Sequence, residues 1–155
     1  MRARACVRDL ALTDEAVVGT SESKAGYLYD ATSGAFKTGL AGKFLYTAKV
    51  SGISNATLVD DTLAATKSAI DPDGTLVGSG DNTFDYGWVV LGLVAQGATT
   101  EAAHVATKLI SFVREDAGFG FDTSENTTAS SADAAGMVLM AIAATKGEGD
   151  SESQA

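Results

Sequence analysis

Apolar side chains concentrate in three runs along the chain, and each run contains a glycine at nearly the same distance from the previous one. The runs read TGLAGKFLYTAKVSG, YGWVVLGLVAQG and AGMVLMAIAATKG, and their reference glycines are Gly39, Gly87 and Gly136. These glycines lie 48 and 49 residues apart. A recurring period of roughly 20 to 50 residues is typical of proteins built from stacked structural repeats.

The three runs predict helices over residues 36–51, 84–96 and 130–146. The second and third runs are apolar on nearly every side, so these helices are expected to be covered all round. A buried strand beginning at Trp88 is the alternative for the second run, because short apolar runs fit either structure. Gly92, Ala95 and the length of the segment favour a helix.

Two further segments have a single apolar side. In residues 99–113 the apolar positions follow the i, i+4, i+7, i+8 spacing of one helical face, namely Val105, Leu109, Phe112 and Val113. The opposite face is polar and carries Glu101, His104, Lys108 and Ser111. Residues 55–70 repeat the pattern more weakly. Their apolar positions are Val59, Leu63 and Ile70, with Asp60 and Asp61 early and Lys67 late, as the helix dipole prefers.

Helices that are apolar all round therefore alternate with one-sided helices, which predicts an all-α fold with an inner and an outer layer. A polar approach precedes each inner helix, and Gly26, Gly74 and Gly118 open these approaches. Glycine accepts the positive backbone angles that tight turns need, so we expect turns at these positions.

The two ends of the chain differ from this pattern. We divide the sequence into a poorly defined segment over 1–25, the repeats over 26–147 and a disordered acidic tail over 148–155. The stretch RDLALTDEAVVG is either an outer helix of an earlier repeat or irregular chain. The end, GEGDSESQA, has no apolar residue except Ala155 and is typical of a disordered tail or a linker.

The charge balance narrows the classes of partner. The 155 residues include 20 acidic and 11 basic side chains, which gives a net charge of −9. Nucleic-acid binders need clustered Lys and Arg to displace counterions, so nucleic acid is not an expected partner. The longest apolar stretches, residues 88–95 and 134–144, are shorter than the roughly 20 residues that span a bilayer. The N-terminal stretch ARACVRDLAL is broken by charges, so we expect no export signal in it.

The third repeat carries a recognisable order of elements. A glycine-rich turn, DAGFGFD, is followed by the polar stretch SSAD and the helix AAGMVLMAIAA. This order resembles the repeat of the prenyltransferase and squalene-cyclase superfamily, and the likeness extends over residues 26–147. The resemblance implies a partial α/α toroid of about five to six helices. It is greatest to the repeats of bacterial secreted or surface proteins, which implies a location outside the cell or on its surface.

The sequence departs from the enzymes of that superfamily at their catalytic positions. The acid motif Asp-x-Asp-Asp-Thr-Ala of the protonating cyclases corresponds to residues 131–136, where Asp133 is the single acid. A protonating acid needs burial and supporting neighbours, whereas Asp133 is explained by an N-terminal helix cap. The zinc ligands of the prenyltransferases have no counterpart, because Cys6 lies outside the repeats and His104 lies on a polar face. We therefore assign no catalytic residue, no metal site and no cofactor.

Four residues are weak candidates for a binding site. Asp85, Tyr86 and Trp88 crowd the start of the second inner helix, and Asp133 begins the third. Aromatic rings beside an acid suit a sugar or a cationic ligand, although packing is the commoner role for aromatics at helical spacing. The stretch DPDGT has two acids but lacks the other ligands of a calcium loop, and a tight turn explains it better.

These observations predict a non-catalytic binding or scaffold module whose partner is an unknown protein, glycan or small molecule. Two alternatives stay open. The first is a fragment of a terpene cyclase or prenyltransferase-like enzyme, and the second is a cobalamin- or glycan-binding module. In a repeat stack an uncapped terminal unit exposes apolar surface, so we also expect self-association through an exposed repeat edge.

Overall fold

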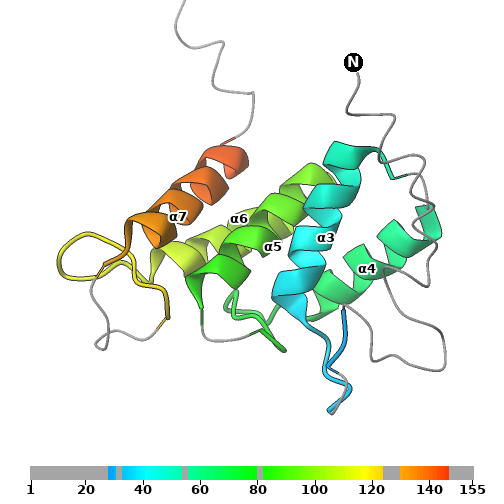
Figure 1. Ribbon diagram of the computed structural model, residues 1–155, viewed down its shortest axis with the longest axis horizontal. Helices are drawn as coiled ribbons and strands as arrows, with labels where there is room; N and C mark the ends of the chain where they lie inside the picture. Colours follow the sequence, from blue (N-terminus) through cyan, green and yellow to red (C-terminus); the bar gives the residue numbers. More distant parts are fainter. Residues whose placement is uncertain (1–27, 31–32, 54–55, 80–81, 124–129, 147–155) are drawn as a thin grey trace, which may run out of the picture.

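The computed structural model describes residues 28–30, 33–53, 56–79, 82–123 and 130–146, and this part of the chain is helical (Figure 1). Its helices are α3 (Thr38–Ser51), α4 (Ala56–Ser68), α5 (Thr83–Ala95), α6 (Thr99–Ile110) and α7 (Ala132–Thr145). Within these ranges β pairing is limited to isolated bridges. The all-α prediction is confirmed, and so is the choice of helix over strand for the segment that carries Trp88. The predicted segments 1–25 and 148–155 lie outside the described residues.

Three of the helices form a row. α5 lies between α3 and α7 and contacts both, and in Figure 1 the three run in the same general direction. α6 returns in the opposite direction and packs against α5 and α7, whereas α4 packs against α3. The helices predicted to be inner thus form one layer, and the helices predicted to be one-sided lie on it.

Glycines bring α3 and α5 into close contact. A Cβ atom on Gly42 would lie 2.6 Å from the backbone nitrogen and the Cα of Val89. A Cβ on Gly92 would overlap the carbonyl oxygen of Gly42. The backbones meet directly at this crossing, which only residues without a side chain permit.

The core has two parts. The larger part joins α5 to α6 and α7 and contains Tyr86, Val89, Val90, Leu93, Val105, Leu109 and Val138. The smaller part lies around α3 and contains Leu28, Ala41, Phe44, Leu45 and Ala48. α5 and α6 each contribute four residues to the larger part, and α5 contacts α3, α6 and α7.

The glycine-rich turn of the third repeat, in residues 116–122, docks on the start of α5. The Thr83 hydroxyl donates to the carbonyl of Gly120 at 2.8 Å, and the Thr83 amide donates to the carbonyl of Phe121 at 2.9 Å. Arg114 and Asp122 form an ion pair at 3.1 Å, and the Arg114 side chain is only 9% exposed. These contacts tie the turn before α7 to the helix that α7 packs against.

Two of the predicted turn glycines have different roles. Gly74 has φ +85°, as expected. Gly118 does not adopt a positive φ, and the preceding Ala117 takes φ 60° instead. The glycine at 118 is needed for space, because a Cβ there would overlap the Ser130 hydroxyl. Gly26 lies outside the described residues.

Two predictions about covered surfaces are wrong. Val113, predicted on the apolar face of the second one-sided helix, is 50% exposed because α6 ends at Ile110 and the chain turns away. α7 is not covered on every side, since Leu139 and Met140 are 65% and 53% exposed. Its buried residues, Ala134, Met137, Val138 and Ala141, occupy one face only. None of the helices in the described ranges combines the length and the apolar character needed to cross a bilayer.

Candidate functional site

The structure separates the four candidate residues into packing and surface positions. Asp85 is half-buried in the first turn of α5, where its amide donates to the Asn82 side chain at 2.8 Å. Its carboxyl group fills the space beside Gly39, and a Cβ on Gly39 would overlap it. Asp85 therefore occupies the crossing between α3 and α5.

Tyr86 belongs to the core. Its side chain is 5% exposed, and its ring meets the Phe112 ring edge to face with the centroids 4.9 Å apart. Its hydroxyl accepts a long hydrogen bond of 3.4 Å from the Leu76 amide. This position favours packing over ligand binding, because a buried ring is not available to a ligand from solvent.

Trp88 lies at the surface between α3 and α5. It is half-buried, and its ring centroid is 5.9 Å from that of Tyr46, at an interplanar angle of 54°. The Lys43 ammonium nitrogen is 5.4 Å from the centre of the Trp88 ring, within cation–π range. Two aromatic rings and one positive charge thus form a small surface, which we call the Trp88 surface, from Lys43, Tyr46 and Trp88.

The Trp88 surface belongs to a stripe along α5. Phe84, Trp88, Leu91 and Ala95 follow the i, i+4, i+7, i+11 spacing, and all four are half-buried. Residues on the other sides of the helix, such as Val89, Val90 and Leu93, are fully buried in the core shared with α6. The stripe therefore marks the side of α5 that no described helix covers, so the prediction that this helix is covered on every side is also wrong.

Asp133 of α7 lies beside the Phe84 end of this stripe. It is exposed in the first turn of α7. The predicted cap role of Asp133 is wrong, because the cap is Ser131, whose side chain accepts from the Ala134 amide at 3.4 Å. A hollow of about 480 Å³ lies beside it and is lined by Phe84, Ala132, Asp133, Gly136, Met137 and Met140. Phe84 of this hollow is one helical turn from Trp88, so the two features are neighbours on α5.

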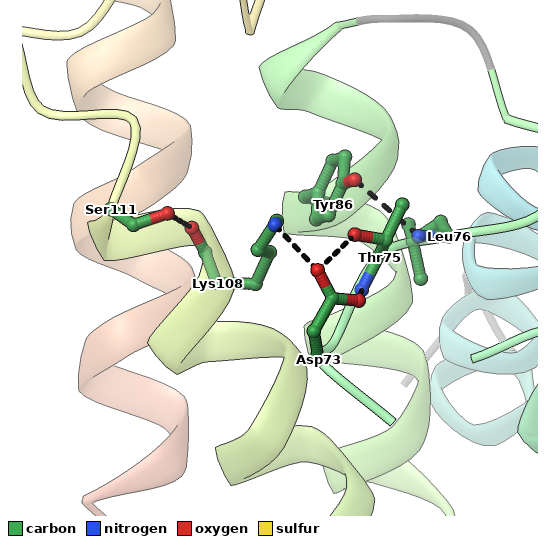
Figure 2. Close-up of polar contacts among 6 residues, drawn as sticks. All are labelled: Asp73, Thr75, Leu76, Tyr86, Lys108 and Ser111. Carbon is green, nitrogen blue, oxygen red and sulfur yellow. Dashed lines mark hydrogen bonds and ion pairs between the residues drawn. The ribbon is translucent and has the colours of Figure 1, made fainter. Parts of the chain in front are cut away.

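The stretch DPDGT forms a turn fixed by side-chain contacts (Figure 2). One carboxylate oxygen of Asp73 accepts from the Thr75 amide at 3.0 Å. The other accepts from the Thr75 hydroxyl at 2.9 Å and from the Lys108 ammonium at 2.8 Å. The hydrogen bond from Lys108, together with those from Thr75, holds the pKa of Asp73 well below its usual range.

These contacts tie the turn before α5 to the outer helix α6. Figure 2 shows Lys108 and Asp73 pointing toward one another, with the Tyr86 hydroxyl directed at the Leu76 amide nearby. The Asp73 carboxylate is thus occupied by partners from its own turn and from α6, which fits a structural role. Across the described ranges, no group of three or more His, Cys, Asp or Glu side chains is placed to hold a metal ion.

Lys43 and Tyr46 are not among the site residues expected from the sequence. The signal was present, because Tyr46 is seven residues after Gly39 and therefore lies on the side of α3 that faces α5. What was missing was the partner, since only the crossing of α3 and α5 brings Tyr46 to Trp88. Comparison with protein-family models, with curated proteins and with solved structures gives no match.

Proposed function

We propose that the chain is a non-catalytic helical-repeat module of the α/α-toroid type that binds a ligand at the Trp88 surface. The observation that carries the proposal is the grouping of Lys43, Tyr46 and Trp88 on the uncovered side of the α3 and α5 pair. In a toroid this is the side that lines the central space. The row of three inner helices with outer helices packed on it supports that arrangement.

The chemistry of the surface suggests a glycan that carries an acidic group. Indole and phenol rings offer a flat apolar face beside a polar edge, which suits the ring face of a sugar. Lys43 and Lys49 give α3 positive charge in a protein whose net charge is −9, and α3 itself contains no acid. A carboxylate on the ligand would therefore meet a locally favourable charge at Lys43.

The exposure of Asp133 supports a non-catalytic role. A carboxylic acid that protonates an alkene needs a pKa raised by burial. Asp133, which occupies the corresponding motif position, is exposed in the first turn of α7. We place the module outside the cell or on its surface, as the resemblance to bacterial repeat proteins implies.

Fluorescence titration tests this function directly, because Trp88 is the single tryptophan of the chain. We expect acidic oligosaccharides to shift or quench the Trp88 emission in a saturable way, and neutral ones to do so more weakly. Lys43→Met should weaken binding of the acidic ligands. His104→Ala, which changes an exposed position on α6, is the matched control and should leave binding unchanged.

Two results would count against the proposal. The first is an emission spectrum that no oligosaccharide in a panel of neutral and acidic sugars alters. The second is equal binding by the Lys43→Met variant and the unmodified chain. Saturable quenching by cobalamin alone would keep the Trp88 surface as a site and overturn the glycan assignment.

A further inference from the structure

One face of α7 has the character of a helix-packing surface but lies open. Its members are spaced along one side of the helix, and they are Ala132, Asp133, Gly136, Leu139, Met140 and Ala143. We call this set the open face of α7. Leu139 and Met140 are 65% and 53% exposed, and they flank Gly136, around which small residues leave room for close approach.

The corresponding glycines of the other two inner helices are occupied. Gly39 of α3 receives the Asp85 side chain from α5. Gly87 of α5 receives the Met137 side chain from α7, and a Cβ on Gly87 would lie 2.7 Å from the Met137 sulfur. At Gly136, among the described residues, no atom beyond its chain neighbours and the backbone of α7 lies within 4 Å of the position that a Cβ would take. Each of the first two glycines thus accommodates a neighbouring helix, and the open face continues the same series.

We propose that the open face of α7 binds the open face of a second copy of this chain, with the two α7 helices antiparallel. This inference goes beyond the proposed function and does not depend on it. The contact would be isologous, so the same residues would be buried on both copies, as in most symmetric dimers.

Charge at the two ends of α7 selects the antiparallel arrangement. Asp133 is an acid in the first turn, and Lys146 is a base at the C-terminal cap. In an antiparallel pair Asp133 lies near the partner's Lys146 at each end of the contact, and the two helix dipoles also oppose each other. A parallel pair would place Asp133 beside the partner's Asp133, which is unfavourable.

The shape of the face also suits a second copy of itself. The hollow of about 480 Å³ beside Gly136 is lined by apolar atoms of Phe84, Met137 and Met140. With Asp133 near the partner's Lys146, residue 140 of one copy lies opposite residue 139 of the other, at the middle of the contact. Methionine side chains adapt to irregular apolar spaces, so the partner's Met140 would pack over Leu139 and Met140 at the edge of the hollow.

The segment that follows α7 in the sequence offers little apolar surface to this face. Residues 147–155 contain a single apolar residue, Ala155. A second copy brings the apolar side chains of its own open face.

The contact should be weak. One face of a helix of 14 residues is about 21 Å long, and a surface of that size falls in the range of transient interfaces. Sedimentation equilibrium of the whole chain between about 5 and 300 μM should show a mass rising from 15.7 kDa toward twice that value. A mass that stays monomeric over the whole range would overturn the proposal.

Two matched variants locate the contact. Met140→Lys puts a charge in the middle of the open face and should raise the dimer dissociation constant by roughly tenfold or more. Val50→Lys changes an apolar residue of α3 that is 67% exposed, and it should leave association unchanged. Both positions are exposed, so the fold should persist, and circular dichroism of the two variants would check this. Equal effects of the two variants, or no effect of Met140→Lys, would contradict the assignment.

Cross-linking decides the orientation. In a Cys6→Ser background, Asp133→Cys and Lys146→Cys are prepared separately and treated with a short bismaleimide, alone and mixed. The antiparallel dimer predicts that the cross-linked dimer forms mainly in the mixture. Efficient cross-linking of the Asp133→Cys variant by itself would show a parallel pair and overturn the antiparallel assignment.

Discussion

Gly42 of α3 and Val89 of α5 lie in direct backbone contact, because a Cβ on Gly42 would be only 2.6 Å from the Val89 Cα. Gly92 faces the same crossing, and a Cβ there would lie 3.0 Å from the Gly42 Cα. α3 and α5 can approach this closely only because both helices carry a glycine at the crossing. The stability of the row therefore depends on residues that bring no side chain.

Replacing glycine by alanine should change the free energy of unfolding in opposite directions at two positions. Gly92→Ala forces α3 and α5 apart and should lower the free energy of unfolding by about 2 kcal/mol or more, because overpacking outweighs the better helix propensity of alanine. Gly136→Ala places its Cβ in open space and should raise the free energy of unfolding by about 0.5–1 kcal/mol. Urea denaturation at low micromolar concentration, where the monomer dominates, measures both. Destabilisation of similar size by the two variants would contradict the packing of α3 on α5.

The contact between α5 and α7 predicts a large effect at Gly87. In Gly87→Val the new side chain overlaps the Met137 side chain, which can move but is only 5% exposed. This substitution should therefore lower the free energy of unfolding by about 1–3 kcal/mol. His104→Ala alters an exposed residue of α6 and should change stability by less than about 0.5 kcal/mol. Thermal melts of the two variants side by side give the comparison. Melting temperatures that agree within a degree would show that the glycine face of α5 is not tightly packed.

The packing role of Tyr86 can be separated from the role of its hydroxyl. Tyr86→Phe removes the hydroxyl that accepts a long hydrogen bond from the Leu76 amide and should lower the free energy of unfolding by about 1 kcal/mol. Tyr86→Ala removes the ring that packs against Phe112 and should lower the free energy of unfolding by about 3–5 kcal/mol. Equilibrium unfolding followed by Trp88 fluorescence measures both variants. If Tyr86→Ala were as stable as Tyr86→Phe, the ring would not be part of the core.

The ion pair between Asp73 and Lys108 predicts a pH dependence. The pKa of Asp73 is lowered by the hydrogen bond from Lys108, so the folded chain binds fewer protons at this group than the unfolded chain does. The stabilising contribution is therefore present above the unfolded pKa of about 3.9 and is lost as the pH falls toward the lower folded pKa.

Asp73→Asn should accordingly reduce the melting temperature slightly at pH 7, and the difference from the unmodified chain should shrink as the pH falls below about 4. The effect is small because the ion pair is open to solvent, with the Asp73 side chain 62% exposed and the Lys108 side chain 26% exposed. It should shrink further in about 1 M salt, where exposed charges are screened. A difference that grows as the pH falls would contradict the lowered pKa.

The described helices were predictable from the sequence. The alternation of all-round and one-sided apolar runs gave α3 to α7 with ends accurate to a few residues, because helix periodicity is a local property of the side-chain pattern. The C-terminal end of α6 was harder to predict from the sequence. Phe112 and Val113 continue the apolar spacing, but the backbone turns after Ile110, and no local signal separates a continued helix from a turn at that point.

The candidate site was only partly predictable. Trp88 and Asp133 were selected from the sequence, and both lie at the surface. Tyr86 was selected with them but is buried against Phe112, a residue 26 positions away. A helix pattern shows which residues share a face, but it does not show which neighbouring helix covers that face.

By itself, the sequence determined the all-α class and the order of the described helices, since these follow from the period of apolar residues and from helix propensity within a dozen neighbours. Only the tertiary structure decided that Lys43 and Tyr46 meet Trp88, that Gly42 touches Val89, and that no other described helix packs against Gly136. Each of these depends on the distance and rotation between two helices. Those quantities are set by the fit of many side chains and backbone atoms at once, and no single segment encodes them.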